Sequence, residues 1–154
     1  MARQNSFALD VRAFVERTKE KQDEVFRSIV IEIARSIITM SPVDTGRFRA
    51  NWQFQVDRVP AGTLEAFDQS AQGAQTIAKI VNETVVLKVG DVAYIANNLP
   101  YSIALEYGLY PNPPKKGTGK TVNGFSTQAK QGMVRITVER FQSIVREELA
   151  KHKL

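Results

Sequence analysis

The first long segment of the chain repeats its hydrophobic residues at helical spacing. Between residues 10 and 40, mostly apolar side chains return every three or four positions, as on one face of an α-helix. The members of this face are Phe14, Thr18, Val25, Ile29, Ile33 and Ile37, with Phe26 and Val30 beside them. Residues 18–24 are almost wholly polar, so we expect the first half of the helix to project from the domain. Ser41-Pro42 should end the helix, because proline disfavours the helical conformation of the residue before it.

Alternating apolar and polar residues follow at 48–59 and predict a β-strand. Phe48, Trp52, Phe54 and Val56 have the same parity, which places Trp52 on the core face. After a turn at residues 60–62, residues 69–88 favour a second helix, and residues 91–98 favour a short strand. The apolar face of this helix would be Ile77, Ile80, Val81, Thr84 and Val85. Its last part, residues 85–89, could equally be a strand, because β-branched residues crowd there.

The last third of the chain combines a short helical turn, a loop and a helix. Residues 99–107 favour the helical turn, and Gly108 is well placed as its C-terminal cap. Proline, glycine and lysine dominate residues 109–125, so we expect an extended loop without regular secondary structure, mobile until a neighbour orders it. The final helix is expected at residues 131–151. Its stripe would be Val134, Val138, Phe141, Val145 and Leu149, with Ile144 beside them.

These elements predict an α+β fold in one domain covering residues 1–154: a long N-terminal helix, a small antiparallel sheet and a C-terminal helix packed on that sheet. A hydrophobic fraction of 43% in 154 residues is enough for one globular core. The chain has no apolar run of the roughly 20 residues that span a bilayer, and its first residues lead into no apolar signal core. We therefore expect neither a membrane contact nor a secretion signal.

Composition also restricts the chemistry that the chain can perform. With no cysteine and a single histidine, His152, disulfides and thiolate metal sites are excluded, and histidine-based triads or metal clusters are implausible. The net charge of +5 permits contact with nucleic acid or with an acidic protein surface. Because the basic residues are mixed with acidic ones, they are more typical of solvated helix faces.

Two short motifs resemble parts of enzyme sites. Asp44-Thr45-Gly46 has the triplet of aspartic proteases, which need two facing carboxylates that share one proton. Here the triplet follows the end of a helix, so we interpret it as a turn in which Gly46 takes a conformation that other residues resist. Residues 117–121 resemble the end of a phosphate-binding loop, but Pro114 stands where that motif needs its first glycine. A flexible basic loop is the better interpretation.

Two further features allow a functional interpretation beside a structural one. Lys115, Lys116 and Lys120 could contact phosphate groups or an acidic protein surface, but no aromatic residues alternate with them as a platform for single strands. Glu106 is the one acid among residues 101–109 and lies between aromatic residues. It could be a catalytic acid with a shifted pKa, but no histidine or second carboxylate is close in sequence, so we favour a structural role. We predict no enzyme activity and no cofactor.

Three segments together resemble a known family. They are Ser41-Pro-Val-Asp-Thr-Gly-Arg-Phe-Arg-Ala-Asn-Trp52, Asn97-Asn-Leu-Pro-Tyr-Ser-Ile-Ala-Leu-Glu-Tyr-Gly108 and Gly132-Met-Val-Arg-Ile-Thr-Val-Glu-Arg-Phe141. In this order, they resemble the siphophage tail-component family of lambda minor tail protein Z and related head–tail joining proteins. The motif residues that we carry over as structural ones are Pro42, Asp44, Thr45, Gly46, Trp52, Asn97, Pro100, Tyr101, Glu106, Gly108 and Gly132.

The resemblance implies a structural protein of the virion, in the tail or neck, which passes through the host cytoplasm during assembly. It implies a hexameric ring of copies that completes the tail and joins it to the head, since rings arise from heterologous contacts that close. The implied partners are other copies of the chain and adjacent tail and head-connector proteins, with genomic DNA passing through the channel without sequence-specific binding. A tail terminator or a head-side connector remains an alternative, as does a small basic nucleic-acid-binding module.

Overall fold

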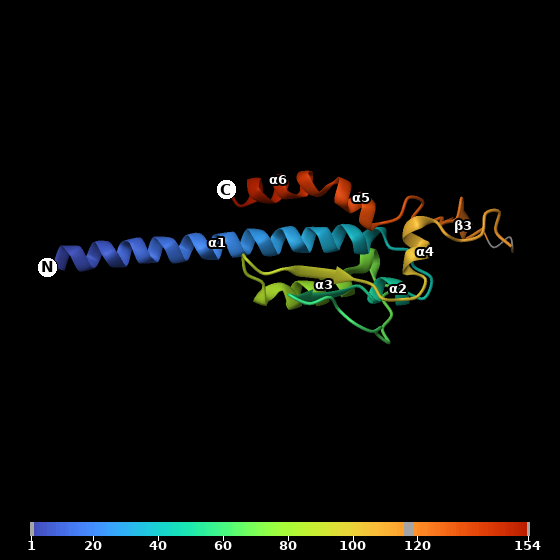
Figure 1. Cartoon of the computed structure of the whole chain (residues 1–154), viewed down its shortest axis with the longest axis horizontal. Coiled ribbons are helices and arrows are strands. Elements are labelled where there is room, and N and C mark those ends of the chain that lie inside the picture. The colour runs from blue at the N-terminus through green and yellow to red at the C-terminus, as the bar shows by residue number, and fades with distance from the viewer. Residues whose placement is uncertain (1, 116–118, 154) are drawn as a thin grey trace.

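A computed structural model of the chain describes residues 2–115 and 119–153, with side chains from residue 10 onward. It is an α+β fold, which confirms the predicted class. Helix α1 (Ala2–Met40) runs through the molecule (Figure 1). Helices α5 (Val134–Glu139) and α6 (Phe141–Lys151) lie along one side of it, and a two-stranded sheet and helix α3 (Ala74–Glu83) lie on the other. One cluster of buried residues, mostly from α1, the sheet and α3, forms the core, and the partly buried Val134 of α5 packs against it. None of the described helices is long and apolar enough to cross a membrane.

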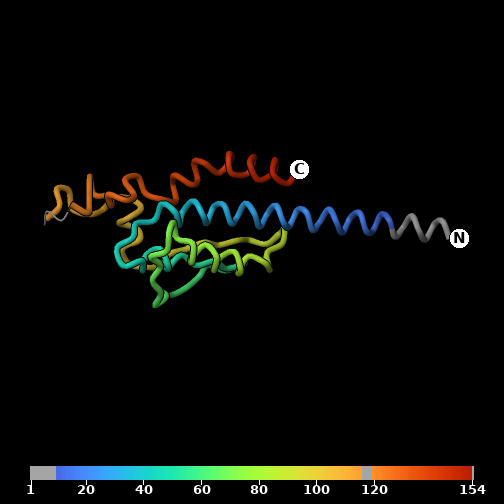
Figure 2. Tube along the Cα trace, turned by 180° about the vertical axis from the view of Figure 1, so that it is seen from behind, coloured from blue at the N-terminus to red at the C-terminus, as the bar shows by residue number. Residues whose placement is uncertain are grey.

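Helix α1 divides into a buried half and an exposed half. Val30, Ala34, Ile37 and Ile38 are buried against the sheet side, and Ser41 ends the helix with its hydroxyl donating to the carbonyl of Ile37 over 2.8 Å. Residues 10–22 are exposed on every side and extend beyond the other elements (Figures 1 and 2). The predicted helix and its projecting first half are therefore confirmed.

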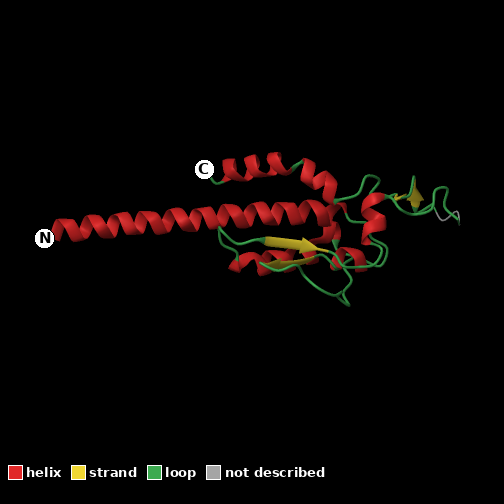
Figure 3. Ribbon diagram, viewed as in Figure 1, coloured by secondary structure: helices red, strands yellow, loops and turns green. Residues whose placement is uncertain are grey.

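The central sheet is shorter than the alternation predicted. Strand β1 (Gln53–Val56) pairs antiparallel with β2 (Ala93–Ala96), in a register that places Gln53 beside Ala96 and Val56 beside Ala93 (Figure 3). Residues 47–50 form a helical turn, α2 (Arg47–Ala50), so a strand from residue 48 was wrong. A spacing of four residues fits a strand face and one turn of helix equally well, which explains the error.

The second predicted helix is interrupted at both ends. The segment consists of the 3-10 turn η1 (Ala71–Gly73), the helix α3 (Ala74–Glu83) and the 3-10 turn η2 (Thr84–Val86). Ile77, Ile80 and Thr84 are buried as predicted, whereas Val85 is 65% exposed. A strand at residues 85–89 was wrong, because the chain turns at η2 and points only Leu87 into the core.

Helix α4 (Ser102–Tyr107) confirms the predicted helical turn, and Gly108 caps it in the left-handed conformation, with φ 66°. The prediction of a loop without regular structure at residues 109–125 was wrong at its end. Strand β3 (Thr121–Val122) pairs with β4 (Phe125–Ser126) across a two-residue turn. Asn123 and Gly124 have φ values of 52° and 84°, as the central residues of a type I′ turn require.

The C-terminal segment is two helices, α5 (Val134–Glu139) and α6 (Phe141–Lys151), which pack on α1 rather than on the sheet (Figure 1). The predicted apolar stripe was wrong at two positions: Val138 is 66% exposed and Phe141 is 47% exposed. Ile144 is buried as predicted, and Thr137 and Glu148, which were not predicted, are buried with it against α1. The Thr137 and Ser36 hydroxyls are 2.9 Å apart, and Ser28 donates to the Glu148 carboxylate, so polar pairs hold this interface.

Candidate functional site

The three segments that carry the family resemblance meet at one end of the molecule, which we call the junction: residues 41–52, 97–108 and 132–141. Two contacts join the first segment to the second. The Asn97 side-chain amide donates to the carbonyl of Phe48 over 2.8 Å, and the Phe48 and Tyr101 rings lie 6.0 Å apart between centroids. Pro100 lies exposed beside Tyr101 at the approach to α4. Segments separated by about fifty residues in sequence therefore form one surface.

The turn at the end of α1 is fixed by Gly46. This residue has φ 88°, and a Cβ atom added to it would lie 2.4 Å from the carbonyl oxygen of Asp68. The Gly46 carbonyl accepts hydrogen bonds from Asp68 N over 2.9 Å and from Ala50 N over 3.0 Å. Only glycine can adopt this conformation and also leave room for the neighbouring backbone. Its expected role as the residue that forms the turn agrees with this geometry.

Asp68 is a buried carboxylate that holds the loop against Gly46. It accepts hydrogen bonds from Ser70 N and Thr76 N, both over 2.9 Å, and from the hydroxyl groups of the same two residues. Burial alone would raise the pKa of Asp68, but these hydrogen bonds outweigh it and hold the pKa at about 2. The carboxylate is therefore ionised and acts as a structural anchor.

Trp52 joins the two ends of the first segment, because its side chain contacts Ser41. Its side chain is buried, and the indole N–H donates to the hydroxyl of Ser41 over 2.8 Å. Its ring meets the Phe48 ring edge-on, with centroids 5.8 Å apart. The prediction that Trp52 belongs to the core is confirmed, although Phe48 reaches it from a helical turn instead of from the same strand.

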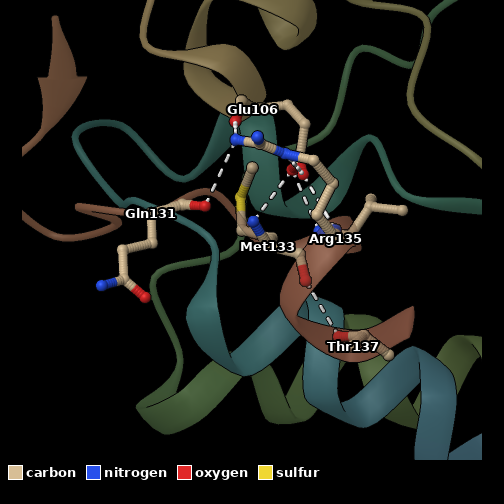
Figure 4. A network of polar contacts seen from close by, with 6 residues as sticks. Glu106, Gln131, Met133, Arg135 and Thr137 are labelled. Atoms are coloured by element: carbon tan, nitrogen blue, oxygen red, sulfur yellow. Dashed lines mark hydrogen bonds and ion pairs between the residues drawn. The ribbon is translucent and has the colours of Figure 1, made fainter. Parts of the chain in front are cut away.

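Glu106 links the second segment to the third (Figure 4). Its carboxylate accepts the backbone N–H groups of Met133 over 2.8 Å, Val134 over 3.0 Å and Arg135 over 2.9 Å. The Arg135 guanidinium donates to the same carboxylate over 3.3 Å and to the Glu106 carbonyl over 2.6 Å. The first N–H groups of a helix lack partners within the helix. The Glu106 carboxylate therefore acts as the acceptor for the first N–H groups of α5 and links that helix to α4.

Gly132 makes the close approach of the two segments possible. It has φ 86°, and an added Cβ atom would lie 2.5 Å from the Glu106 carbonyl oxygen. Burial raises the pKa of Glu106, but the three backbone hydrogen bonds and Arg135 outweigh it, so the net pKa is lowered. A general acid at neutral pH needs the opposite shift. The surroundings of Glu106 suit a structural cap.

Glu106→Gln is expected to lower the free energy of unfolding by about 1–3 kcal/mol at neutral pH, because one acceptor oxygen and the charge are lost. Since folding lowers the pKa of Glu106, its ionised form adds stability that is complete above the ordinary value of 4.5 and disappears as the pH falls through the folded value. The difference between variant and wild type should therefore shrink in acid. Urea unfolding at several pH values measures it.

Glu139→Gln is the matched control, because Glu139 is an exposed acid at the other end of α5, the helix that Glu106 caps. It should change stability little at any pH. A Glu106→Gln deficit that stays constant from neutral pH into acid would contradict the capping role of the carboxylate.

An open groove of about 580 Å³ lies beside the junction, between the turn at residues 42–48 and the hairpin. Phe48, Tyr101, Leu105 and Tyr110 give it an apolar floor. Pro42 and Gln128 lie along its wall, and the Gln128 side-chain amide pairs with both backbone groups of Val43, each over 2.9 Å. The groove has the size and lining of a binding site for a side chain or a short segment.

Asp44 and Lys120 form an ion pair at the edge of this groove, with 3.4 Å between Oδ2 and Nζ. Both side chains are largely exposed, at 82% and 69%. Asp44 thus faces a lysine and solvent rather than a second carboxylate, as the turn interpretation expects. Thr45 is also exposed, and its hydroxyl accepts the Arg47 N–H over 3.3 Å.

The basic segment is only partly within the described residues. Lys115 is exposed, whereas Lys116 and residues 117 and 118 of the suspected phosphate loop lie outside the described residues. Thr121, the last residue of that suspected motif, belongs to strand β3. Among the described residues, no group of three or more histidine, cysteine, aspartate or glutamate side chains is placed to hold a metal ion.

Sequence reasoning missed three residues that shape the junction. The fully buried Asn51 donates to the carbonyls of Arg47 and Leu64 and accepts Leu64 N over 2.7 Å, which holds the loop after β1. Gln128 pairs with Val43, as described above. Arg135 binds Glu106 and also lies over the Tyr107 ring, 4.7 Å from its centroid. None of these has a local sequence signal, because each holds the junction through a partner at least 13 residues away along the chain.

Models of known protein families, curated proteins and solved structures were all compared with this chain, and none matched.

Proposed function

We propose that this chain is a non-enzymatic structural subunit of a tailed bacteriophage, which completes the tail and joins it to the head as a member of a ring in the neck. The observation that carries the proposal is the junction. The three segments with the family resemblance are hydrogen-bonded to each other through Asn97 and Glu106. Patterns shared by chance would have no reason to meet in one structural unit.

The surface beside the junction supports an assembly role. The groove offers an apolar floor with an exposed ion pair at its edge, which suits a contact with another protein chain. The hairpin of β3 and β4 extends away from the core next to it (Figure 3). We propose that the groove and hairpin receive a neighbouring copy or an adjacent ring. A tail terminator or head-side connector would use the same kind of contact at a different level of the neck.

Infection tests the proposal. In a tailed phage whose genome encodes this chain, loss of the gene should leave filled heads and separate tails, and the wild-type gene supplied in trans should restore virions. Tyr101→Arg, which places a charge on the groove floor, should restore them poorly. Lys130→Glu is the control, because Lys130 is exposed and does not line the groove.

Electron microscopy of intact virions gives the second readout. Density for this chain is expected at the head–tail junction. Its absence there, together with normal virions in the deletion strain, would refute the proposal. Tight DNA binding that weakens steeply with salt would favour a nucleic-acid-binding module instead.

A further inference from the structure

The projecting half of α1 has no partner within the described chain. Residues 10–22 are exposed (Figures 1 and 2). The first described hydrogen bond between α1 and a later part of the chain is at Asp23, whose carboxylate accepts the Val89 N–H over 2.9 Å. A helical segment of this length is marginal in water when it packs against nothing. The segment therefore gains stability from any surface that covers its apolar side.

The apolar side of this segment is narrow and regular. Val11 is 45% exposed, Phe14 64% and Val15 42%. Val11, Phe14, Thr18 and Lys21 follow the alternating spacing of three and four that forms the seam of a coiled coil, and the next position, Val25, is already buried in the domain. The Thr18 hydroxyl donates to the Phe14 carbonyl over 2.9 Å, so it needs no partner across an interface. A second helix can therefore pack here without burying an unsatisfied hydroxyl.

We propose that this segment pairs antiparallel with the same segment of a second copy of the chain. In the antiparallel register, Val11 of each copy packs against Phe14 of the other, which gives two equivalent apolar layers. The contact uses none of the junction residues. This pairing is two-fold and belongs to the free protein, whereas a ring closes through heterologous contacts. It thus goes beyond the proposed function and does not depend on the groove.

The charges beside the seam select both the partner and its direction. Asp10 and Arg17 occupy equivalent positions next to the seam, one heptad apart, and among the described side chains neither has an ion-pair partner. In the antiparallel register, Asp10 of each copy faces Arg17 of the other, so the interface contains this pair twice. A parallel pair would instead place the Lys21 side chains directly opposite each other in the seam, which is repulsive.

Sedimentation of the full chain over a wide concentration range tests the proposal. The wild type should form a dimer, weakly, because the seam has few layers. Asp10→Arg alone and Arg17→Asp alone should each weaken the dimer on the order of tenfold, since both ion pairs become like-charge contacts. The double variant D10R/R17D should restore the wild-type affinity. Glu20→Arg, the same charge change off the seam, should leave it unchanged.

The absence of cysteine gives an independent test of direction. Under oxidation, Thr18→Cys should not cross-link to itself in an antiparallel pair, whereas a parallel pair would join the two residues. A monomer at every concentration, a dimer that ignores the single charge reversals, or a rapid Thr18→Cys cross-link would each overturn the proposal. A dimer abolished by Phe141→Asp and not by Asp10→Arg would overturn it in favour of the exposed face of α5 and α6. None of these results depends on virion assembly, so failure here is distinct from failure of the proposed function.

Discussion

Gly46→Val is expected to lower the free energy of unfolding by roughly 2–6 kcal/mol, the largest loss among the variants proposed. With φ 88°, a β-branched residue at this position adds roughly 1–3 kcal/mol of backbone strain. The new side chain also meets the Asp68 carbonyl oxygen, 2.4 Å from the Cβ position, and overpacking of this kind costs about 1–3 kcal/mol more. The total is a large share of the roughly 5–15 kcal/mol that stabilises a typical domain. Circular dichroism and urea unfolding measure it.

Gly62→Val separates the two causes. Gly62 also has a positive φ, of 74°, but no atom lies within 4 Å of its Cβ position. This variant should therefore lose stability only through backbone strain, without a steric clash, and should remain folded. If the two variants lost equal stability, the close approach of Gly46 to the Asp68 backbone would have no energetic role.

Trp52→Ala should have the second largest effect. The side chain is 5% exposed and packs against Phe48, so its truncation removes a large buried ring and leaves a cavity. Substitutions of this kind cost about 3–5 kcal/mol. The variant should unfold at a much lower urea concentration than the wild type, with a similar dependence on urea.

Trp52→Phe tests the hydrogen bond to Ser41 separately from the bulk of the ring. It keeps an aromatic ring but loses the indole N–H, whose 2.8 Å hydrogen bond should contribute about 1 kcal/mol. Ser41→Ala should lose more, because the Ser41 hydroxyl also donates to the Ile37 carbonyl, and the two losses should not add fully in the double variant. An additive double variant would show that Trp52 and Ser41 contribute independently.

Local patterns predicted the parts of the fold that local forces determine. The spacing of apolar residues in α1 and the position of Gly108 after α4 both depend on neighbours within a few residues, and both predictions were confirmed. The hairpin also had a local signal, the dipeptide Asn123-Gly124 between two short extended segments. The many prolines and glycines before it led to the prediction of a loop, although they do not bear on residues 121–126.

Long-range partners account for most of the remaining errors. Thr137 and Glu148 look like solvent-facing residues in the sequence, but Ser36 and Ser28 of α1 give them polar partners, so they and not Val138 face the core. The role of Glu106 depends on three N–H groups that lie 27 to 29 residues further along the chain. Sequence analysis identified Glu106 and Gly46 as important residues, but only the structure shows which backbone atoms they contact.

The groove wall and the cap of α5 both come late in the chain. The partner of Val43 is Gln128, and the partners of Glu106 are residues 133–135. A ribosome adds residues from the N-terminus at roughly 5–20 per second. The helix α1 and the turn at Gly46 therefore leave the ribosome well before the segments that complete the groove. A truncated chain lacks that wall, so only the finished chain has the complete groove.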